Sequence, residues 1–179
     1  MSAKKTALIT GVTGQDGAYL AKLLLEKNYH VVGAVRRAST LNLPRLAALN
    51  IDRDVELQTL DVQDLTSIVR MIETIQPDEI YNLSGQSSPQ ASFQQPLYTG
   101  ETSGLGTLRL LEAIRLMNAR ARFYQASSSE IFGEAQGDMQ NELTDFRPKS
   151  PYGVTKLYAH WTVINYRQAY DLHASSGIL

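Results

Sequence analysis

Short runs of apolar residues alternate with longer amphipathic stretches along the whole chain. Short apolar runs favour buried strands, whereas apolar residues spaced three and four positions apart favour helices. The pattern predicts strands at residues 6–10, 31–35, 55–60, 79–83, 122–126 and 173–179, and helices at residues 18–27, 64–75, 104–116 and 150–170. This alternation is typical of a parallel sheet covered on both faces, so the sequence predicts a doubly wound α/β fold.

The composition excludes several classes of function. The chain has 179 residues, of which 43% are hydrophobic and 20% charged, as expected for one soluble globular domain. Its net charge of -1 gives no general reason to expect nucleic acid or an anionic membrane as a partner. No cysteine is present, and the three histidines lack acids at ligand spacing, so no metal site is expected. The apolar run after residue 5 is too short for a signal peptide or membrane span, so we expect a soluble, cytoplasmic protein.

A series of three glycines directly follows the first predicted strand: Gly11, Gly14 and Gly17. Glycine suits this place because the turn is tight and because a pyrophosphate has to approach the bare backbone. The helix that follows would point its free N–H groups at that anion. A plain strand-to-helix turn is the alternative, but the position after the first strand favours a Rossmann-type dinucleotide site.

The end of the second predicted strand indicates which dinucleotide would bind. NAD sites usually carry an acidic residue there, which holds the ribose 2′-hydroxyl. This strand instead runs into Arg36, Arg37, Ala38 and Ser39, without a carboxylate. Two guanidinium groups and a hydroxyl suit a 2′-phosphate. The sequence therefore predicts NADP, although paired arginines after a strand can also be merely solvated.

A tyrosine and a lysine share one face of the last predicted helix. Tyr152 and Lys156 are four positions apart, and Ser150 and Pro151 suit the N-cap and the first helical position. The helix dipole and the Lys156 ammonium are both expected to favour a tyrosine phenolate, which could remove a proton from a sugar hydroxyl. Tyrosines elsewhere on this helix show that aromatic residues here can also serve packing, and Trp161 is expected in the core.

A serine-rich segment follows the fifth predicted strand and ends in Glu130. Ligands bind at the carboxyl ends of parallel strands, so a hydroxyl such as that of Ser128 could bond a reacting oxygen there. Glu130 could act as a general base. The alternative is a loop whose serine and acid only cap the next turn.

These motifs together resemble the extended short-chain dehydrogenase/reductase family and, within it, the GDP-mannose 4,6-dehydratases. The likeness runs over essentially the whole chain. The stretches that carry it are Gly-Val-Thr-Gly-Gln-Asp-Gly-Ala-Tyr-Leu at residues 11–20, Arg-Arg-Ala-Ser at 36–39, Gly-Thr-Leu-Arg-Leu-Leu-Glu-Ala-Ile-Arg at 106–115, Arg-Phe-Tyr-Gln-Ala-Ser at 122–127 and Ser-Pro-Tyr-Gly-Val at 150–154.

The resemblance implies a lyase that converts GDP-mannose to GDP-4-dehydro-6-deoxy-mannose with tightly bound NADP, by internal hydride transfer and loss of water. Tyr152 would deprotonate the mannose 4-hydroxyl, and Glu130 would take the proton from C5. Ser128 stands where the family usually has threonine, and Lys156 would also hold the nicotinamide ribose. The implied cofactor contacts are Gly11, Thr13, Gly14, Gln15, Asp16, Gly17, Arg36, Arg37, Ser39, Asp61, Val62, Leu83, Gln86, Ser87, Tyr98 and Lys156. The resemblance also implies a homodimer or homotetramer.

Two further features depart from the family pattern. Residues 84–87 read Ser-Gly-Gln-Ser where the family has Ala-Ala-Gln-Ser or Gly-Ala-Gln-Ser, and Ser-Pro-Gln follows at 88–90. The chain also stops inside a predicted strand, so we expect residues 1–179 to be the NADP-binding domain with the catalytic residues, and the smaller C-terminal substrate domain to be largely missing.

Other functions stay open at this point. An epimerase, a reductase of the GDP-fucose synthase type or a dehydratase for another nucleotide sugar would share the glycine loop and the Tyr–Lys pair. Glu130 favours dehydration, since epimerisation and reduction need no such base at C5. A non-catalytic NADP-binding module is the alternative of another class.

Overall fold

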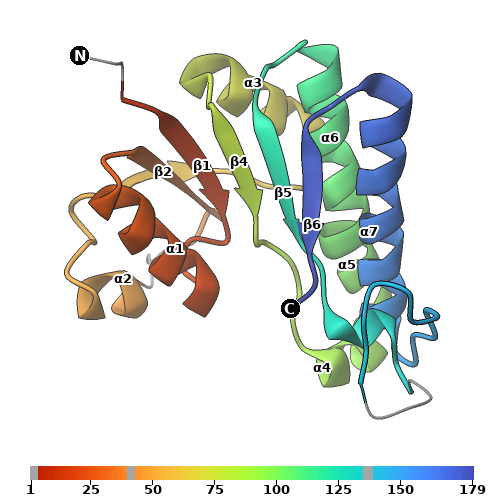
Figure 1. The fold of residues 1–179 in the computed structure, drawn as a ribbon. Coiled ribbons are helices and arrows are strands. Elements are labelled where there is room, and N and C mark those ends of the chain that lie inside the picture. Colours follow the sequence, from red (N-terminus) through yellow and green to blue (C-terminus); the bar gives the residue numbers. More distant parts are fainter. Residues whose placement is uncertain (1–3, 40–42, 135–138) are drawn as a thin grey trace.

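The computed structural model describes residues 4–39, 43–134 and 139–179. Its centre is a parallel sheet with the strand order β3-β2-β1-β4-β5-β6 (Figure 1). The strands are β1 (Thr6–Thr10), β2 (His30–Val35), β3 (Glu56–Thr59), β4 (Glu79–Asn82), β5 (Arg122–Ala126) and β6 (Ala174–Gly177). This is the order of a doubly wound Rossmann-type sheet, and it confirms the predicted fold class.

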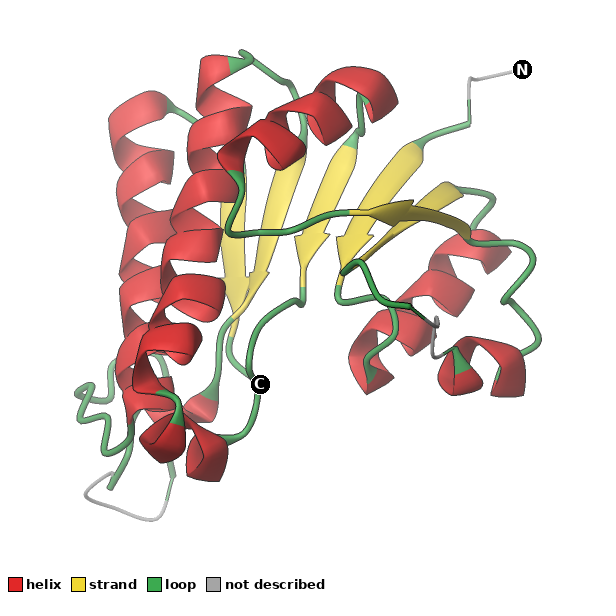
Figure 2. Ribbon diagram, turned by 180° about the vertical axis from the view of Figure 1, so that it is seen from behind, coloured by secondary structure: helices red, strands yellow, loops and turns green. Residues whose placement is uncertain are grey.

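Helices cover the sheet in two groups, on opposite faces (Figures 1 and 2). One face carries α1 (Gln15–Glu26) and α2 (Pro44–Ala48), and the other carries α3 (Leu65–Ile75), α6 (Gly106–Leu116) and α7 (Pro151–Tyr170). Successive strand residues point to opposite faces, so Leu8 belongs to the core under α3 and α6, while Ala7 and Ile9 belong to the core under α1. Each described helix is too short or too polar to cross a membrane.

The helix ends follow the signals in the sequence. Ser150 is the N-cap of α7, and its hydroxyl accepts a hydrogen bond of 3.0 Å from the Gly153 N–H. Pro151 takes the first helical position, as predicted. The side chain of Asp64 caps α3 in the same way, through the Thr66 N–H at 2.9 Å. These caps fix where the helices begin relative to the strand ends.

Several elements differ from the prediction. The helix predicted at residues 104–116 begins earlier, because α5 (Pro96–Thr99) continues through the π-helical segment η1 (Gly100–Leu105) into α6 without a break. Two short helices, α2 and α4 (Pro89–Gln94), were not predicted. The expectation that Trp161 lies in the core is wrong: its side chain is 53% exposed and packs edge-on against Phe146.

Candidate functional site

Backbone contacts that only glycine permits fix the turn between β1 and α1. Gly11 has a φ of 76°, and a Cβ there would lie 2.7 Å from the Leu83 carbonyl oxygen. A Cβ on Gly17 would lie 2.3 Å from the Gly11 carbonyl oxygen. Gly14 is the N-cap of α1 and has no side chain to bond the first-turn N–H groups, which leaves them for an anion.

We predict that Gly17→Ala destabilises the protein and that Gly100→Ala does not. Both glycines are helical, so alanine gains the same helix propensity at each. No described atom lies within 4 Å of a Cβ on Gly100, whereas a Cβ on Gly17 strikes backbone. Denaturant unfolding should show a loss of about 1–3 kcal/mol for Gly17→Ala and a gain of up to about 1 kcal/mol for Gly100→Ala. Equal stability of the two variants would contradict the tight turn.

A cavity of about 270 Å³ opens above this turn, at the carboxyl ends of β1, β2, β3 and β4. Its lining joins the glycine turn to the residues that follow the neighbouring strands. The lining residues are Thr10, Gly11, Thr13, Gly14, Ala34, Val35, Arg36, Leu60, Val62, Leu83, Ser84, Gly85, Ser87, Tyr98 and Thr102. Such a position, at the point where the strand order reverses, is where dinucleotides bind in this fold.

The cavity gathers half of the predicted cofactor contacts. Those that line it are Gly11, Thr13, Gly14, Arg36, Val62, Leu83, Ser87 and Tyr98. Those that do not are Gln15, Asp16, Gly17, Arg37, Ser39, Asp61, Gln86 and Lys156. Some lining residues were not predicted, such as Ala34, Leu60 and Ser84. They lie within two positions of a strand end, so strand position alone would have indicated them. Thr102 lies in η1 and carried no such signal.

Arg36 reaches across the rim of the cavity. Its Nη1 donates a hydrogen bond to the hydroxyl of Tyr98, and its guanidinium lies 6.0 Å from the centre of that ring. Arg37 is exposed and contributes nothing to the lining. Of the two arginines predicted to hold a 2′-phosphate, the structure therefore places only Arg36 at the cavity.

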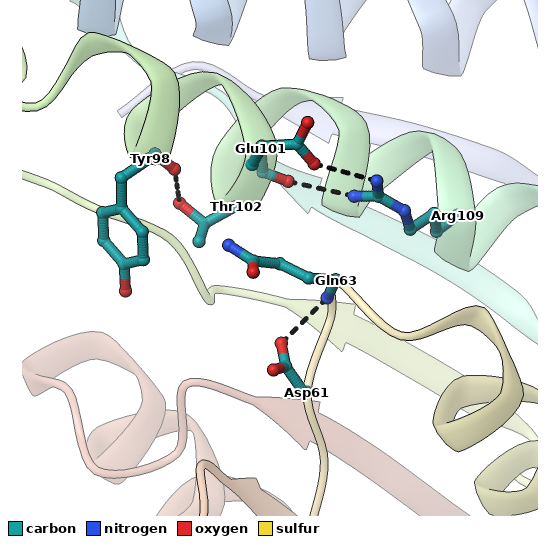
Figure 3. Close-up of polar contacts among 6 residues, drawn as sticks. All are labelled: Asp61, Gln63, Tyr98, Glu101, Thr102 and Arg109. Atoms are coloured by element: carbon teal, nitrogen blue, oxygen red, sulfur yellow. Dashed lines mark hydrogen bonds and ion pairs between the residues drawn. The ribbon is translucent and has the colours of Figure 1, made fainter.

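The loop after β3 forms the neighbouring part of the rim, opposite η1 (Figure 3). The carboxylate of Asp61 accepts the Gln63 N–H at 2.9 Å, which holds the loop in a turn. Across from it, Arg109 forms an ion pair of 2.8 Å with Glu101, and the Thr102 hydroxyl bonds the Tyr98 carbonyl. These contacts fix both sides of the rim within the protein, and Leu60 and Val62 are the residues of this loop that line the cavity.

A second group of predicted residues meets where α7 begins beside the end of β5. Ser128 and Tyr152 are both 8% exposed, and the Ser128 side chain lies close enough to lower the pKa of Tyr152. Ser128 is also the N-cap of the 3-10 turn η2 (Ser129–Ile131), since its Oγ accepts the Glu130 N–H at 3.3 Å. The serine therefore caps the turn, as the alternative interpretation held, and also contacts Tyr152. Glu130 is exposed.

Lys156 lies one helical turn beyond Tyr152 and is 7% exposed. Its Nζ donates a 2.8 Å hydrogen bond to the Ala126 carbonyl and lies 5.7 Å from the centre of the Tyr152 ring. The structure thus brings Ser128, Glu130, Tyr152 and Lys156 together at one place.

Burial opposes the charged form of both buried groups. Desolvation raises the pKa of Tyr152; the Ser128 side chain works in the opposite direction, and the charge of Glu130 raises the pKa further. Desolvation also lowers the pKa of Lys156 to about 8. The expectation of a lowered tyrosine pKa is therefore wrong for this arrangement of the protein groups, in which burial and the charge of Glu130 outweigh the effect of Ser128.

The departures from the family pattern have structural reasons. A Cβ at Gly85 would lie 2.6 Å from the Ser103 hydroxyl, so glycine at this position accompanies a serine in η1. Ser88 is the N-cap of α4 and accepts the Ala91 N–H at 3.2 Å, with Pro89 in the first turn. Residues 88–90 therefore form the start of a helix, which accounts for polar residues and proline at these positions.

Comparison with known proteins agrees with this geometry. The sequence profile of the family described as GDP-mannose 4,6 dehydratase matches residues 8–179. A GDP-mannose 4,6-dehydratase from Sinorhizobium fredii is 52% identical over 100% of this chain and 53% of its own length. One from Homo sapiens is 48% identical over 98% of this chain and 50% of its own. The chain thus spans about half the length of the curated relatives it matches.

A solved structure shows the same fold. The UDP-glucose 4-epimerase from Brucella ovis, determined in complex with NAD, superimposes with a TM-score of 0.86 at 25% identity. The match covers 97% of this chain and 51% of the epimerase. Fold, site geometry and sequence profile agree, and the chain belongs to the GDP-mannose 4,6-dehydratase family.

Proposed function

We propose that the protein carrying this chain is a hydro-lyase that converts GDP-mannose to GDP-4-dehydro-6-deoxy-mannose. The observation that carries the proposal is the meeting of Ser128, Tyr152 and Glu130 beside a buried lysine. Relatives that are about half identical over the whole chain are GDP-mannose 4,6-dehydratases, which supports GDP-mannose as the substrate. A homo-oligomer and a cytoplasmic location stay predictions from the sequence.

The cofactor we propose is NADP. The glycine turn forms a cradle that a Cβ would fill, and the cavity above it is bordered by the guanidinium of Arg36. When bound, NADP⁺ supplies the acceptor for a hydride, which it later returns. The turn and the start of α1 would hold the pyrophosphate, and Arg36 the 2′-phosphate.

The side chains divide the proton transfers between them. Tyr152 takes the proton from the 4-hydroxyl of the mannose, while the Ser128 hydroxyl bonds the same oxygen. The ketone at C4 makes the C5 proton acidic. Glu130, on the exposed side of the site, removes that proton and passes it to the C6 hydroxyl, which leaves as water, and Tyr152 later returns its own proton to C5. Lys156 keeps a positive charge close to Tyr152 and so favours the phenolate.

The function is tested by incubating the protein with GDP-mannose and a catalytic amount of NADP⁺. Because the relatives are about twice as long, a chimera in which residues 1–179 replace the matching part of the Vibrio cholerae relative is tested in parallel. We expect mass spectrometry to show a product lighter by one water. Unchanged GDP-mannose with a chimera that is folded and binds NADP⁺ would contradict the proposed substrate.

We predict that Arg36→Ala weakens NADP⁺ binding by about 10- to 100-fold, the value of one charge-assisted hydrogen bond. NAD⁺ has no 2′-phosphate, so its affinity should change little. Arg37→Ala is the matched control, since Arg37 is exposed and does not line the cavity. Calorimetric titration of both nucleotides measures the effect. Equal losses in the two variants, or a parent chain that prefers NAD⁺, would contradict the NADP assignment.

A further inference from the structure

A series of buried hydrogen bonds connects the phosphate-binding turn with Lys156. It crosses the carboxyl ends of three neighbouring strands through Thr10 of β1, Asn82 of β4 and Gln125 of β5. These side chains are only 1%, 2% and 1% exposed. The Thr10 hydroxyl bonds Asn82 Oδ1 at 2.6 Å, and Asn82 Nδ2 bonds Gln125 Oε1 at 2.7 Å. Thr10 immediately precedes the glycine turn, so one end of the series lies at the cavity.

The other end of the series is the Ala126 carbonyl, at the end of β5. This oxygen accepts Gln125 Nε2 at 2.9 Å and Lys156 Nζ at 2.8 Å. Since both donors bond the same oxygen, the amide and the ammonium are within about 6 Å of each other. The lysine that the proposed function places beside Tyr152 is thus held by an atom that Gln125 also holds.

The chemistry of the end atom sets the direction of every bond in the series. A carbonyl can only accept, so Gln125 has to present its amide nitrogen to Ala126 and its oxygen to Asn82. Asn82 then has to present its nitrogen to Gln125 and its oxygen to the hydroxyl donors, which are Thr10 and Ser84. Neither amide can turn over without placing two acceptors against each other in a buried site.

We propose that Gln125 and Asn82 are positioning residues for Lys156. They hold the Ala126 carbonyl in place as the acceptor for the ammonium, and they connect this carbonyl with β1, the strand that leads into the glycine turn. If either side-chain amide in the series turned over, the atoms that lie near the Lys156 ammonium would change. The inference rests on the proposed function, because that function has Lys156 keep a positive charge close to Tyr152.

The surroundings of Lys156 make such a change measurable. Tyr152 on the same helix is the titratable side chain beside the ammonium, and Glu130 on η2 acts on Tyr152. Within the described residues, burial is the cause that shifts the pKa of Lys156, and no charged group on the strands and helices packed against α7 contributes. A change in the groups that face Lys156 would therefore shift a pKa to which no charge of the described residues contributes.

The test is Asn82→Asp, which keeps the shape but cannot donate to Gln125. The Gln125 amide then has to turn, and its oxygen faces Ala126 and Lys156. Carbon-13 NMR of labelled lysine Cε, assigned with Lys156→Arg, gives the titration midpoint of Lys156. We expect the midpoint to rise by about one pH unit, because the partly negative amide oxygen replaces the partly positive amide nitrogen within about 6 Å of the ammonium.

A double-mutant cycle separates this effect from the direct charge of the new carboxylate. In a Gln125→Met background the carboxylate is present but the amide that would turn is not. We expect the rise to be about one pH unit larger with Gln125 than with methionine. An equal rise in both backgrounds, or no rise, would overturn the proposal.

A second variant covers the case that Asn82→Asp does not fold. Gln125→Glu keeps the acceptor for Asn82 Nδ2 and for the Thr107 hydroxyl but loses the donor to Ala126. The Lys156 midpoint should again rise by at least about one pH unit, and an unchanged midpoint would overturn the proposal. The titration needs neither substrate nor turnover, so its failure is distinguishable from a failure of the proposed function.

Discussion

Tyr152→Phe is expected to lower kcat for GDP-mannose by about 10²- to 10⁴-fold, the usual contribution of a positioned acid or base. The ring is 8% exposed and packed, so phenylalanine fills the same space and only the hydroxyl that contacts Ser128 is lost. NADP⁺ affinity should be unchanged, because Tyr152 does not line the cavity. Steady-state kinetics with calorimetric titration of NADP⁺ measure both.

Tyr158→Phe is the matched control for this prediction. Tyr158 lies on the same helix, but its side chain is 43% exposed. Its variant should keep the kcat of the parent. If Tyr152→Phe were as active as Tyr158→Phe, Tyr152 would not be the base.

Glu130→Gln is expected to abolish the loss of water while leaving NADP⁺ binding intact. Glutamine keeps the length of the side chain and the backbone bond to Ser128, but it cannot take a proton from C5. In deuterated water the parent should exchange the C5 hydrogen of the sugar, and the variant should do so about 10²- to 10⁴-fold more slowly. Mass spectrometry of the nucleotide sugar measures the exchange.

Glu134→Gln controls for the removal of a nearby charge. Glu134 follows in the same segment, is 83% exposed and pairs with Lys149 at 3.2 Å. Its variant should exchange deuterium like the parent. Undiminished exchange in Glu130→Gln would remove Glu130 from the mechanism.

The sequence predicted the sheet and the long helices because each carries a local signal. The apolar runs became β1 to β6, and Ser150 with Pro151 marked the start of α7. The sequence missed α5 and most of η1, in a stretch where three glycines, Gly100, Gly104 and Gly106, each disfavour a helix by themselves. Packing requires two of them: a Cβ would lie 3.1 Å from Thr155 at Gly104 and 3.1 Å from Val62 at Gly106. Close approach of neighbouring elements is a tertiary requirement that local propensity does not express.

In the site, too, some features carry a local sequence signal and others depend on tertiary packing. Glycine spacing and strand ends indicated the turn and the proposed catalytic group, because these depend on positions in the chain. The exclusion of Arg37 from the cavity and the raised pKa of Tyr152 depend on which side chains become buried. The series through Asn82 and Gln125 joins strands distant in sequence, and no spacing rule would have found it.

The most direct measurement of the central claim uses GDP-mannose labelled with deuterium at C4 of the sugar and a catalytic amount of NADP⁺. If the enzyme moves a hydride within one sugar and expels water, the product should carry the deuterium at C6, and reduced cofactor should not accumulate. A product without the label, or one equivalent of reduced cofactor for each sugar consumed, would contradict the dehydratase assignment.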